Sequence, residues 1–245
     1  MMLTEACLDF QLESNKFTRQ FELQLSKFLG ISHVFAVNSE FLANMLVLSA
    51  LTSPILEKKK LNKDDEIIIS PFLSFSTVNL IIKMGLKPVT VDIKTETVNI
   101  DVSQLEKALN RKTKALFLSY TLGNLFNIQR VRDFADKYNL WLIEDCSESL
   151  GAKYIDKYTG SFSDIAIFSF GTTNHITMGG GSAVATNNSI LNDIILACMS
   201  EHFKTAEMQA AIGCAQLRKL PYFIYARKRN FELLLDGLKP YQGYL

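Results

Sequence analysis

The sequence carries almost no net charge, no long apolar run and no sign of an export signal. Its 26 lysines and arginines nearly balance 25 aspartates and glutamates, so a net charge of +1 gives no argument for a nucleic acid or an anionic membrane as partner. No apolar run approaches the roughly 18 residues that a membrane span needs. The N-terminus MMLTEACLDFQ lacks a basic region followed by an apolar one, which argues against a secretory signal. We therefore expect a soluble, cytoplasmic protein.

The four cysteines are widely scattered, at Cys7, Cys146, Cys198 and Cys214. They form no CxxC pair and no other spacing typical of metal ligands, so neither a zinc site nor an iron–sulfur cluster is predicted. Because no export signal is predicted, the thiols are expected to be reduced. The sequence thus gives no support for a metal site.

Internal repeats and low-complexity segments are absent, and short apolar runs alternate with amphipathic ones along the chain. The apolar runs predict strands at 34–37, 66–70, 88–93, 115–119, 141–144, 165–170 and 183–186. The amphipathic patterns predict helices at 17–29, from a cap at Asn38 or Ser39 to 50, and at 77–84, 101–109, 128–138, 190–199, 206–217 and 221–235. Strands separated by helices of this length indicate an α/β fold, with a mostly parallel sheet flanked by helices on both faces.

Two stretches carry the strongest functional signals, FSFGTTNHITMGGGS at 168–182 and IEDCSESLGA at 143–152. Further short motifs lie before and after these stretches: ALTSP at 50–54, TVN at 77–79, TLGN at 121–124, KYNLWLIED at 137–145, KYTGSFSD at 157–164 and EMQAAIG at 207–213. In this order, from about residue 17 to 235, the chain resembles the DegT-type family of pyridoxal-phosphate-dependent proteins of fold type I. Members of this family aminate or deoxygenate nucleotide sugars, and the motifs here are most similar to those of the deoxygenating (dehydrase) branch.

The resemblance implies that residues 1–235 form the large domain of the fold-type-I transferases. Residues 236–245 would then be a truncated tail, with the small C-terminal domain missing. A second segment is expected to be deleted after Met199, because that residue runs almost directly into EHFKTAEMQAAIG. In the dehydrase branch this segment is rich in ligands for an iron–sulfur cluster, so its loss again argues against a cluster here.

The cofactor implied by the resemblance is pyridoxal 5′-phosphate or pyridoxamine 5′-phosphate. Asp145 takes the place of the carboxylate that pairs with the protonated pyridine nitrogen and keeps the ring an electron sink. Ser169 takes the place of the serine that holds the 5′-phosphate. The remaining cofactor-binding positions are Glu148, Phe41 and Leu42.

The slot of the catalytic residue holds Asn174. Most of the family has a lysine there, which forms a Schiff base with the cofactor, and the dehydrase branch has a histidine. An amide can neither form a Schiff base nor take up a proton at neutral pH, so any bound cofactor is expected to be held non-covalently. His175 matches the second of two adjacent histidines in that branch, and two interpretations stay open: a catalytic base, or a loop histidine satisfied by hydrogen bonds. We expect Asp145 and Ser169 on one side of a single cleft, with Asn174 and His175 on its rim.

Two further departures concern cofactor binding. Glu40, Phe41 and Leu42 replace the Gly-Ser-Ser of the family's phosphate cradle, which removes two hydroxyls and adds a negative charge. Ser74 stands where the family places an aromatic residue against the ring. Phe72 and Phe75 flank it. One alternative is that they take over the stacking role through a shift of the loop register, but they are expected to be core residues, because phenylalanine is abundant throughout the chain.

Two functions remain open. The first is a nucleotide-sugar 3-dehydrase or aminotransferase of deoxysugar and O-antigen (lipopolysaccharide) synthesis, with impaired activity and a CDP-linked 4-keto-6-deoxy sugar as the expected substrate. The second is an inactive homologue that serves as a scaffold or partner subunit, or a decaying gene product. A homodimer, or pairing with an intact paralogue, is expected in either case, since active sites of this family draw residues from two chains.

Overall fold

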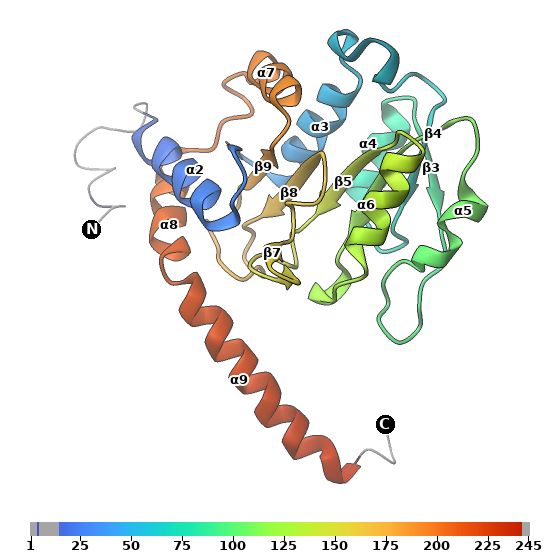
Figure 1. The fold of residues 1–245 in the computed structure, drawn as a ribbon. Helices are drawn as coiled ribbons and strands as arrows, with labels where there is room; N and C mark the ends of the chain where they lie inside the picture. The colour runs from blue at the N-terminus through green and yellow to red at the C-terminus, as the bar shows by residue number, and fades with distance from the viewer. Residues whose placement is uncertain (1–3, 5–14, 242–245) are drawn as a thin grey trace.

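The computed structural model describes residue 4 and residues 15–241 (Figure 1). Seven strands form its main sheet: β1 (His33–Val37), β2 (Glu66–Ile69), β3 (Lys87–Thr90), β4 (Thr113–Ser119), β5 (Trp141–Asp145), β8 (Ile165–Ser169) and β9 (Ser182–Thr186). Their order is β1-β9-β8-β5-β4-β2-β3. The strands from β8 to β3 are mutually parallel, and β9 runs antiparallel to both of its neighbours. A mostly parallel α/β sheet is therefore confirmed.

The helices cover both faces of this sheet. They are α2 (Lys16–Leu29), α3 (Glu40–Leu51), α4 (Phe75–Lys83), α5 (Leu105–Ala108), α6 (Ile128–Lys137), α7 (Ser189–Cys198), α8 (Glu207–Leu217) and α9 (Leu220–Leu238). One apolar cluster joins the sheet to α2, α6 and α8, and a second joins its other face to α3, α4 and α7. Side chains alternate between the two clusters along each strand: in β5, Leu142 belongs to the first, and Trp141 and Ile143 belong to the second.

The N-terminal helix α2 is capped by a residue from the far end of the chain. Asn15 precedes α2 in a left-handed conformation and forms no side-chain cap. Instead, the buried carboxylate of Glu207, at the start of α8, accepts hydrogen bonds from Phe17 N (2.8 Å), Thr18 N (3.0 Å) and Thr18 Oγ1 (2.5 Å). The helix ends at Gly30, whose left-handed backbone is the usual C-terminal stop. Glu207 thus fixes the contact between α2 and α8.

A second buried carboxylate supports the edge of the sheet where its parallel strands end. Glu144 in β5 is fully buried and accepts hydrogen bonds from the Tyr120 hydroxyl and from Gly160 N (3.0 Å), Phe162 N (3.2 Å) and Ser163 N (2.9 Å). The small hairpin of β6 (Lys153–Tyr154) and β7 (Lys157–Tyr158) precedes this loop. The network ties Tyr120, which follows β4, to the 160–163 loop, which leads into β8.

The last helix, α9, projects away from the rest of the molecule (Figure 1). Its first residue, Leu220, is buried, and Ile224 packs against Gly151, whose φ of +85° and missing side chain make room for it. Farther along, Tyr225, Phe231 and other apolar side chains are exposed. The helix continues to Leu238, so the domain boundary expected at residue 235 stays a prediction. Within the described ranges, no helix, α9 included, combines the length and the apolarity that a bilayer crossing requires.

Candidate functional site

A pocket of about 400 Å³ lies at the carboxyl ends of the parallel strands. It is lined by Glu40, Phe72, Ser74, Ser119, Tyr120, Thr121, Leu122, Asp145, Ser147, Glu148, Thr173 and Asn174. Three carboxylates face it and no lysine, arginine or histidine is among its lining residues, so we refer to it as the acidic pocket. Pockets at this edge are where open α/β sheets bind ligands.

Asp145, the last residue of β5, is one of the three carboxylates. Its Oδ1 accepts hydrogen bonds from Ser147 N (3.1 Å) and Ser147 Oγ (2.6 Å). The pKa of Asp145 is raised to about 6, mainly by burial and also by the charges of Glu40 and Glu148, against the lowering effect of the Ser147 hydrogen bonds. A positively charged group in the pocket would favour the ionised form, which is the partnership that the sequence predicted with a pyridinium nitrogen.

Ser119 is a site residue that the sequence reasoning missed. It ends β4, directly beside Asp145 in the neighbouring strand, and it lines the acidic pocket. Its hydroxyl is buried and has no hydrogen-bond partner within the described part of the chain. A buried polar atom without a partner costs free energy, so this hydroxyl marks a position that a polar ligand group would satisfy. The sequence could have indicated Ser119 as a site residue, because it ends an apolar strand as Asp145 does.

The side chains of Asn174 and Ser169 both lie close to Gly171. A Cβ placed on Gly171 would lie 3.0 Å from Asn174 Oδ1 and 4.0 Å from Ser169 Oγ, so both side chains approach the same point. Asn174 Nδ2 also donates a hydrogen bond to the carbonyl oxygen of Ser147 (2.8 Å). Ser169 is buried at the end of β8 and, unlike Asn174, is not part of the pocket lining. Asn174 thus ties its loop to the turn that follows Asp145.

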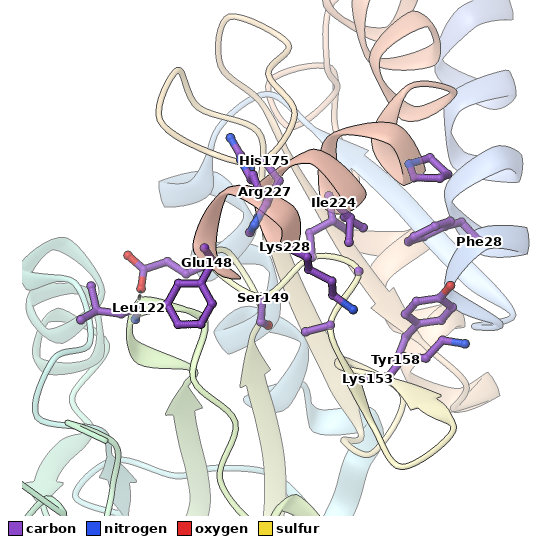
Figure 2. A pocket seen from close by; sticks show the side chains of 16 residues that line it. Phe28, Leu122, Glu148, Ser149, Lys153, Tyr158, His175, Ile224, Arg227 and Lys228 are labelled. Atoms are coloured by element: carbon purple, nitrogen blue, oxygen red, sulfur yellow. Dashed lines mark hydrogen bonds between the residues drawn. The ribbon is translucent and has the colours of Figure 1, made fainter. Parts of the chain in front are cut away.

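His175 lies in a different, adjoining pocket, so the expectation of one cleft with both loop residues on its rim is wrong. This second pocket, of about 690 Å³, is lined by four basic side chains, Lys153, His175, Arg227 and Lys228, and we refer to it as the basic pocket (Figure 2). Asn174 is hydrogen-bonded to Ser147, whereas the side chain of His175 lies beside Arg227 of α9 (Figure 2). Burial lowers the pKa of His175, and the positive charge of Arg227 lowers it further.

Glu148 and Leu122 line both pockets and form the wall between them. Leu122 N donates a hydrogen bond to Glu148 Oε2 (2.6 Å). Leu122 has a φ of +56°, an unfavourable conformation for a branched residue that is found preferentially at functional sites. The predicted cofactor-binding residue Glu148 therefore faces the acidic pocket with its carboxylate already accepting one hydrogen bond.

Phe41 and Leu42 do not line either pocket, although both were predicted to contact the cofactor. Phe41 is 47% exposed, and Leu42 packs against the apolar cluster around α3. Ser39 caps α3, as predicted: its side chain accepts a hydrogen bond from Leu42 N (3.3 Å). The residue of this turn that faces the acidic pocket is Glu40.

Phe72 and Phe75 are not core residues, which corrects the expectation from the sequence. They are 56% and 79% exposed, because the loop after β2 carries them beyond the sheet edge. Phe72 lines the acidic pocket. Ser74 caps α4 with its hydroxyl, which accepts a hydrogen bond from Thr77 N (3.3 Å).

The described residues contain no group of three or more metal-binding side chains.

Comparisons with known proteins agree with the resemblance. The sequence profile of the DegT/DnrJ/EryC1/StrS aminotransferase family matches residues 2–245. The lipopolysaccharide biosynthesis protein RfbH of Salmonella typhimurium is 38% identical over 284 positions, which cover 100% of this chain and 65% of the relative. The dTDP-4-dehydro-2,6-dideoxy-D-glucose 3-dehydratase of Saccharopolyspora spinosa is 31% identical over 99% of this chain and 61% of its own.

Among solved structures, the Escherichia coli GDP-4-keto-6-deoxy-D-mannose-3-dehydratase with bound hydrated PLP superposes with a TM-score of 0.88. It is 28% identical, and the match covers 97% of this chain and 69% of that one. The chain therefore spans about two thirds of the length of its relatives. The RfbH alignment has 284 positions against 245 residues here, so the relative has residues inside the matched region that this chain lacks. Their predicted position, after Met199, stays a prediction.

Proposed function

Because the chain belongs to the DegT/DnrJ/EryC1/StrS aminotransferase family, we propose that it is a dehydrase-type member that binds its cofactor weakly and has strongly impaired activity. Its relatives include 3-dehydratases and transaminases of nucleotide sugars and a lipopolysaccharide biosynthesis protein. From the similarity to the dehydrase branch, the substrate class proposed is a CDP-linked 4-keto-6-deoxy sugar. The proposed setting is cytoplasmic deoxysugar and O-antigen synthesis.

The half of the acidic pocket around Asp145 fits the ring of pyridoxal or pyridoxamine phosphate. Asp145 offers a carboxylate to the ring nitrogen, Ser119 offers an unpartnered hydroxyl, and Phe72 offers an aromatic face. When bound, the cofactor accepts the electron pair that the substrate releases as a proton leaves. Asp145, ionised by a cationic partner, would hold the ring in its electron-accepting form.

The part of the acidic pocket next to α3 is a poor match for the phosphate of the same cofactor. Glu40 places a carboxylate in the pocket at the helix N-terminus, where a dianion would otherwise be favoured. Among the described residues, no cationic side chain lines the pocket to offset this charge. Repulsion between two such charges is worth about 1–4 kcal/mol near a protein surface, which corresponds to roughly a 5- to 1,000-fold loss of affinity. We therefore expect binding that is non-covalent and weak.

One observation carries the proposal of impaired activity: the amide of Asn174, which the resemblance assigns to the slot of the catalytic residue, is held by a hydrogen bond. Its Nδ2 donates to Ser147 O, and its Oδ1 faces Gly171, so the side chain is committed to structure. An amide neither attaches the cofactor nor carries a proton at neutral pH. Loss of a catalytic acid–base group costs a factor of roughly 10²–10⁴ in rate. His175, in the adjoining basic pocket, is poorly placed to take over.

The test compares the natural protein with Asn174→Lys and Asn174→His variants. Absorbance spectra with added pyridoxal phosphate, followed by borohydride reduction and mass spectrometry, should show covalent attachment in Asn174→Lys and none in the natural protein. The matched control is Asn230→Lys, since Asn230 is an exposed asparagine on α9. Turnover of a CDP-4-keto-6-deoxy sugar should appear or rise in Asn174→His. A reducible adduct on the natural protein, or turnover that is lost in His175→Asn, would contradict the proposal.

The second candidate function, a partner subunit, is favoured by the exposed apolar side chains of α9. Tyr222, Tyr225, Phe231, Leu233, Leu234 and Leu235 are all about half exposed or more. Exposed apolar surface of this extent typically marks a protein–protein contact. Light scattering of the purified protein, alone and mixed with an intact dehydrase of the family, tests this candidate. A strictly monomeric protein that leaves the partner's mass unchanged would argue against it.

A further inference from the structure

The acidic pocket contains three carboxylates, and no lysine, arginine or histidine is among its described lining residues. Glu40 comes from the first turn of α3, Asp145 from the end of β5, and Glu148 from the turn that follows β5. Within the part of the chain that the structure describes, none of the three forms an ion pair. Burial, and after it the charges of Glu40 and Glu148, raises the pKa of Asp145, so the three groups are close enough to interact. The pocket therefore favours a cation.

A buried hydroxyl independently marks the same pocket as a place for a ligand. Ser119 is 9% exposed, lines the pocket at the end of β4, and lies opposite Asp145 in the neighbouring strand. Its Oγ is buried and has no hydrogen-bond partner among the described residues. A hydroxyl oxygen accepts hydrogen bonds, and an ammonium group donates three. The hydroxyl and the carboxylates thus favour the same kind of ligand, a cation that donates hydrogen bonds.

The size and lining of the pocket favour an organic cation over a bare metal ion. Its volume of about 400 Å³ is within the range of small-molecule sites. A metal ion needs several ligands around one point, and the described residues contain no group of three or more side chains that could hold one. Phe72 adds an aromatic face, on which a second ring can stack.

From these observations we propose that the acidic pocket binds a small aromatic amine that carries no phosphate, with its ammonium group among the carboxylates of Glu40, Asp145 and Glu148. The ring would lie against Phe72, and Ser119 Oγ would accept a hydrogen bond from the ammonium group. The inference goes beyond the proposed function. That function expects weak binding of a phosphorylated cofactor, whereas here the same negative charges select a different class of ligand.

Isothermal titration calorimetry with pyridoxamine and pyridoxamine 5′-phosphate tests the role of charge, because the two probes differ only in the phosphate. Pyridoxamine should bind at least about fivefold more tightly, the lower end of the effect of one carboxylate on a phosphate. Glu40→Gln should weaken pyridoxamine binding and tighten binding of the phosphate ester. Glu96→Gln is the matched control, since Glu96 is exposed and lies outside the pocket lining, and it should change neither affinity.

Benzylamine and benzoate separate a site for aromatic amines in general from one for pyridoxamine. Benzylamine has only the ring and the ammonium group, and benzoate is its anionic counterpart. Benzylamine should bind and benzoate should not. Equal affinities for benzylamine and pyridoxamine would assign the site to aromatic amines as a class, and tighter pyridoxamine binding would assign it to the unphosphorylated form of the cofactor. Both results support the proposal.

The pH dependence of benzylamine binding is measured on the natural protein and needs no variant. Affinity should fall up to about tenfold between pH 7.5 and pH 5, because Asp145, with a pKa of about 6, loses its charge while benzylamine keeps its own. Tyr120 also lines the pocket but stays neutral, because burial raises its pKa above its ordinary value. Ser119→Ala should weaken binding about two- to tenfold without lowering the urea midpoint, since its hydroxyl has no partner among the described residues.

Five results would each overturn the proposal: no benzylamine binding at millimolar concentration, benzoate binding as tight as benzylamine binding, pyridoxamine phosphate binding more tightly than pyridoxamine, equal effects of Glu40→Gln and Glu96→Gln, or an affinity that does not change with pH. The titrations use no aldehyde and no nucleotide sugar. They can therefore fail while the impaired catalysis of the proposed function is confirmed, and the reverse.

Discussion

Replacing Asp145 by asparagine should stabilise the protein at neutral pH. The folded-state pKa of Asp145 is about 6, above its ordinary value of 3.8, because the carboxylate is desolvated and lies near Glu40 and Glu148. Between pH 4 and pH 6 the folded state therefore binds more protons than the unfolded state, and stability contributed by this group falls as the pH rises through that window. Asparagine keeps an acceptor for the two Ser147 hydrogen bonds but has no charge to desolvate.

The size of the effect follows from the shift. A difference between 3.8 and about 6 corresponds to at most about 3 kcal/mol at pH 7.5. Because the side chain is only partly buried, water screens part of this cost, and we expect a gain of about 1–2 kcal/mol for Asp145→Asn. At pH 4, where the folded-state carboxyl is protonated, the variant and the natural protein should have equal stabilities.

Urea unfolding followed by circular dichroism, at intervals from pH 4 to pH 8, measures this difference directly. Asp101→Asn is a control of opposite sign: hydrogen bonds from Ser103 lower the pKa of exposed Asp101, so its stabilising contribution is present above pH 4 and lost as the pH falls. A lower stability of Asp145→Asn at pH 7.5, or a difference that does not change between pH 4 and pH 8, would refute the reasoning.

Three further outcomes are expected. Glu207→Ala should lower the free energy of unfolding by about 2–4 kcal/mol in urea titrations, since it removes the acceptor for three hydrogen bonds at the start of α2. Gly151→Ala should destabilise the protein by about 1 kcal/mol or more and speed limited proteolysis of α9, because its Cβ would meet Ile224 Cδ1 at 2.4 Å; unchanged proteolysis would contradict this packing. Phe72→Ala should weaken pyridoxamine phosphate binding about two- to tenfold in fluorescence titrations but leave the urea midpoint unchanged, since Phe72 is largely exposed; equal affinity would remove it from the ring site.

The sequence predicted the sheet and its helices because their apolar periodicity is set by burial on two faces, as the alternation in β5 shows. It also predicted that Asp145 and Ser169 each end a strand at the same edge of the sheet, because β5 and β8 are parallel neighbours. It failed where the outcome depends on the direction of single side chains. Consecutive loop residues Asn174 and His175 face different pockets, and periodicity has no information about an irregular loop. The exposure of Phe72 was missed because an aromatic residue after a strand is more often buried.

The cap that Glu207 places on α2 has a consequence for how the chain is made. The acceptor for α2 is synthesised about 190 residues after it, which is a delay of roughly 10–40 s at 5–20 residues per second. Until then the apolar side of α2, with Phe17 and Phe21, has no α8 to cover it, because α8 passes close to Phe21 at Gly213. Closing so long a loop also costs about 4–5 kcal/mol of chain entropy. We therefore expect α2 to reach its final position only after α8 is made, and nascent chains stalled before Glu207 to bind chaperones through this exposed apolar surface.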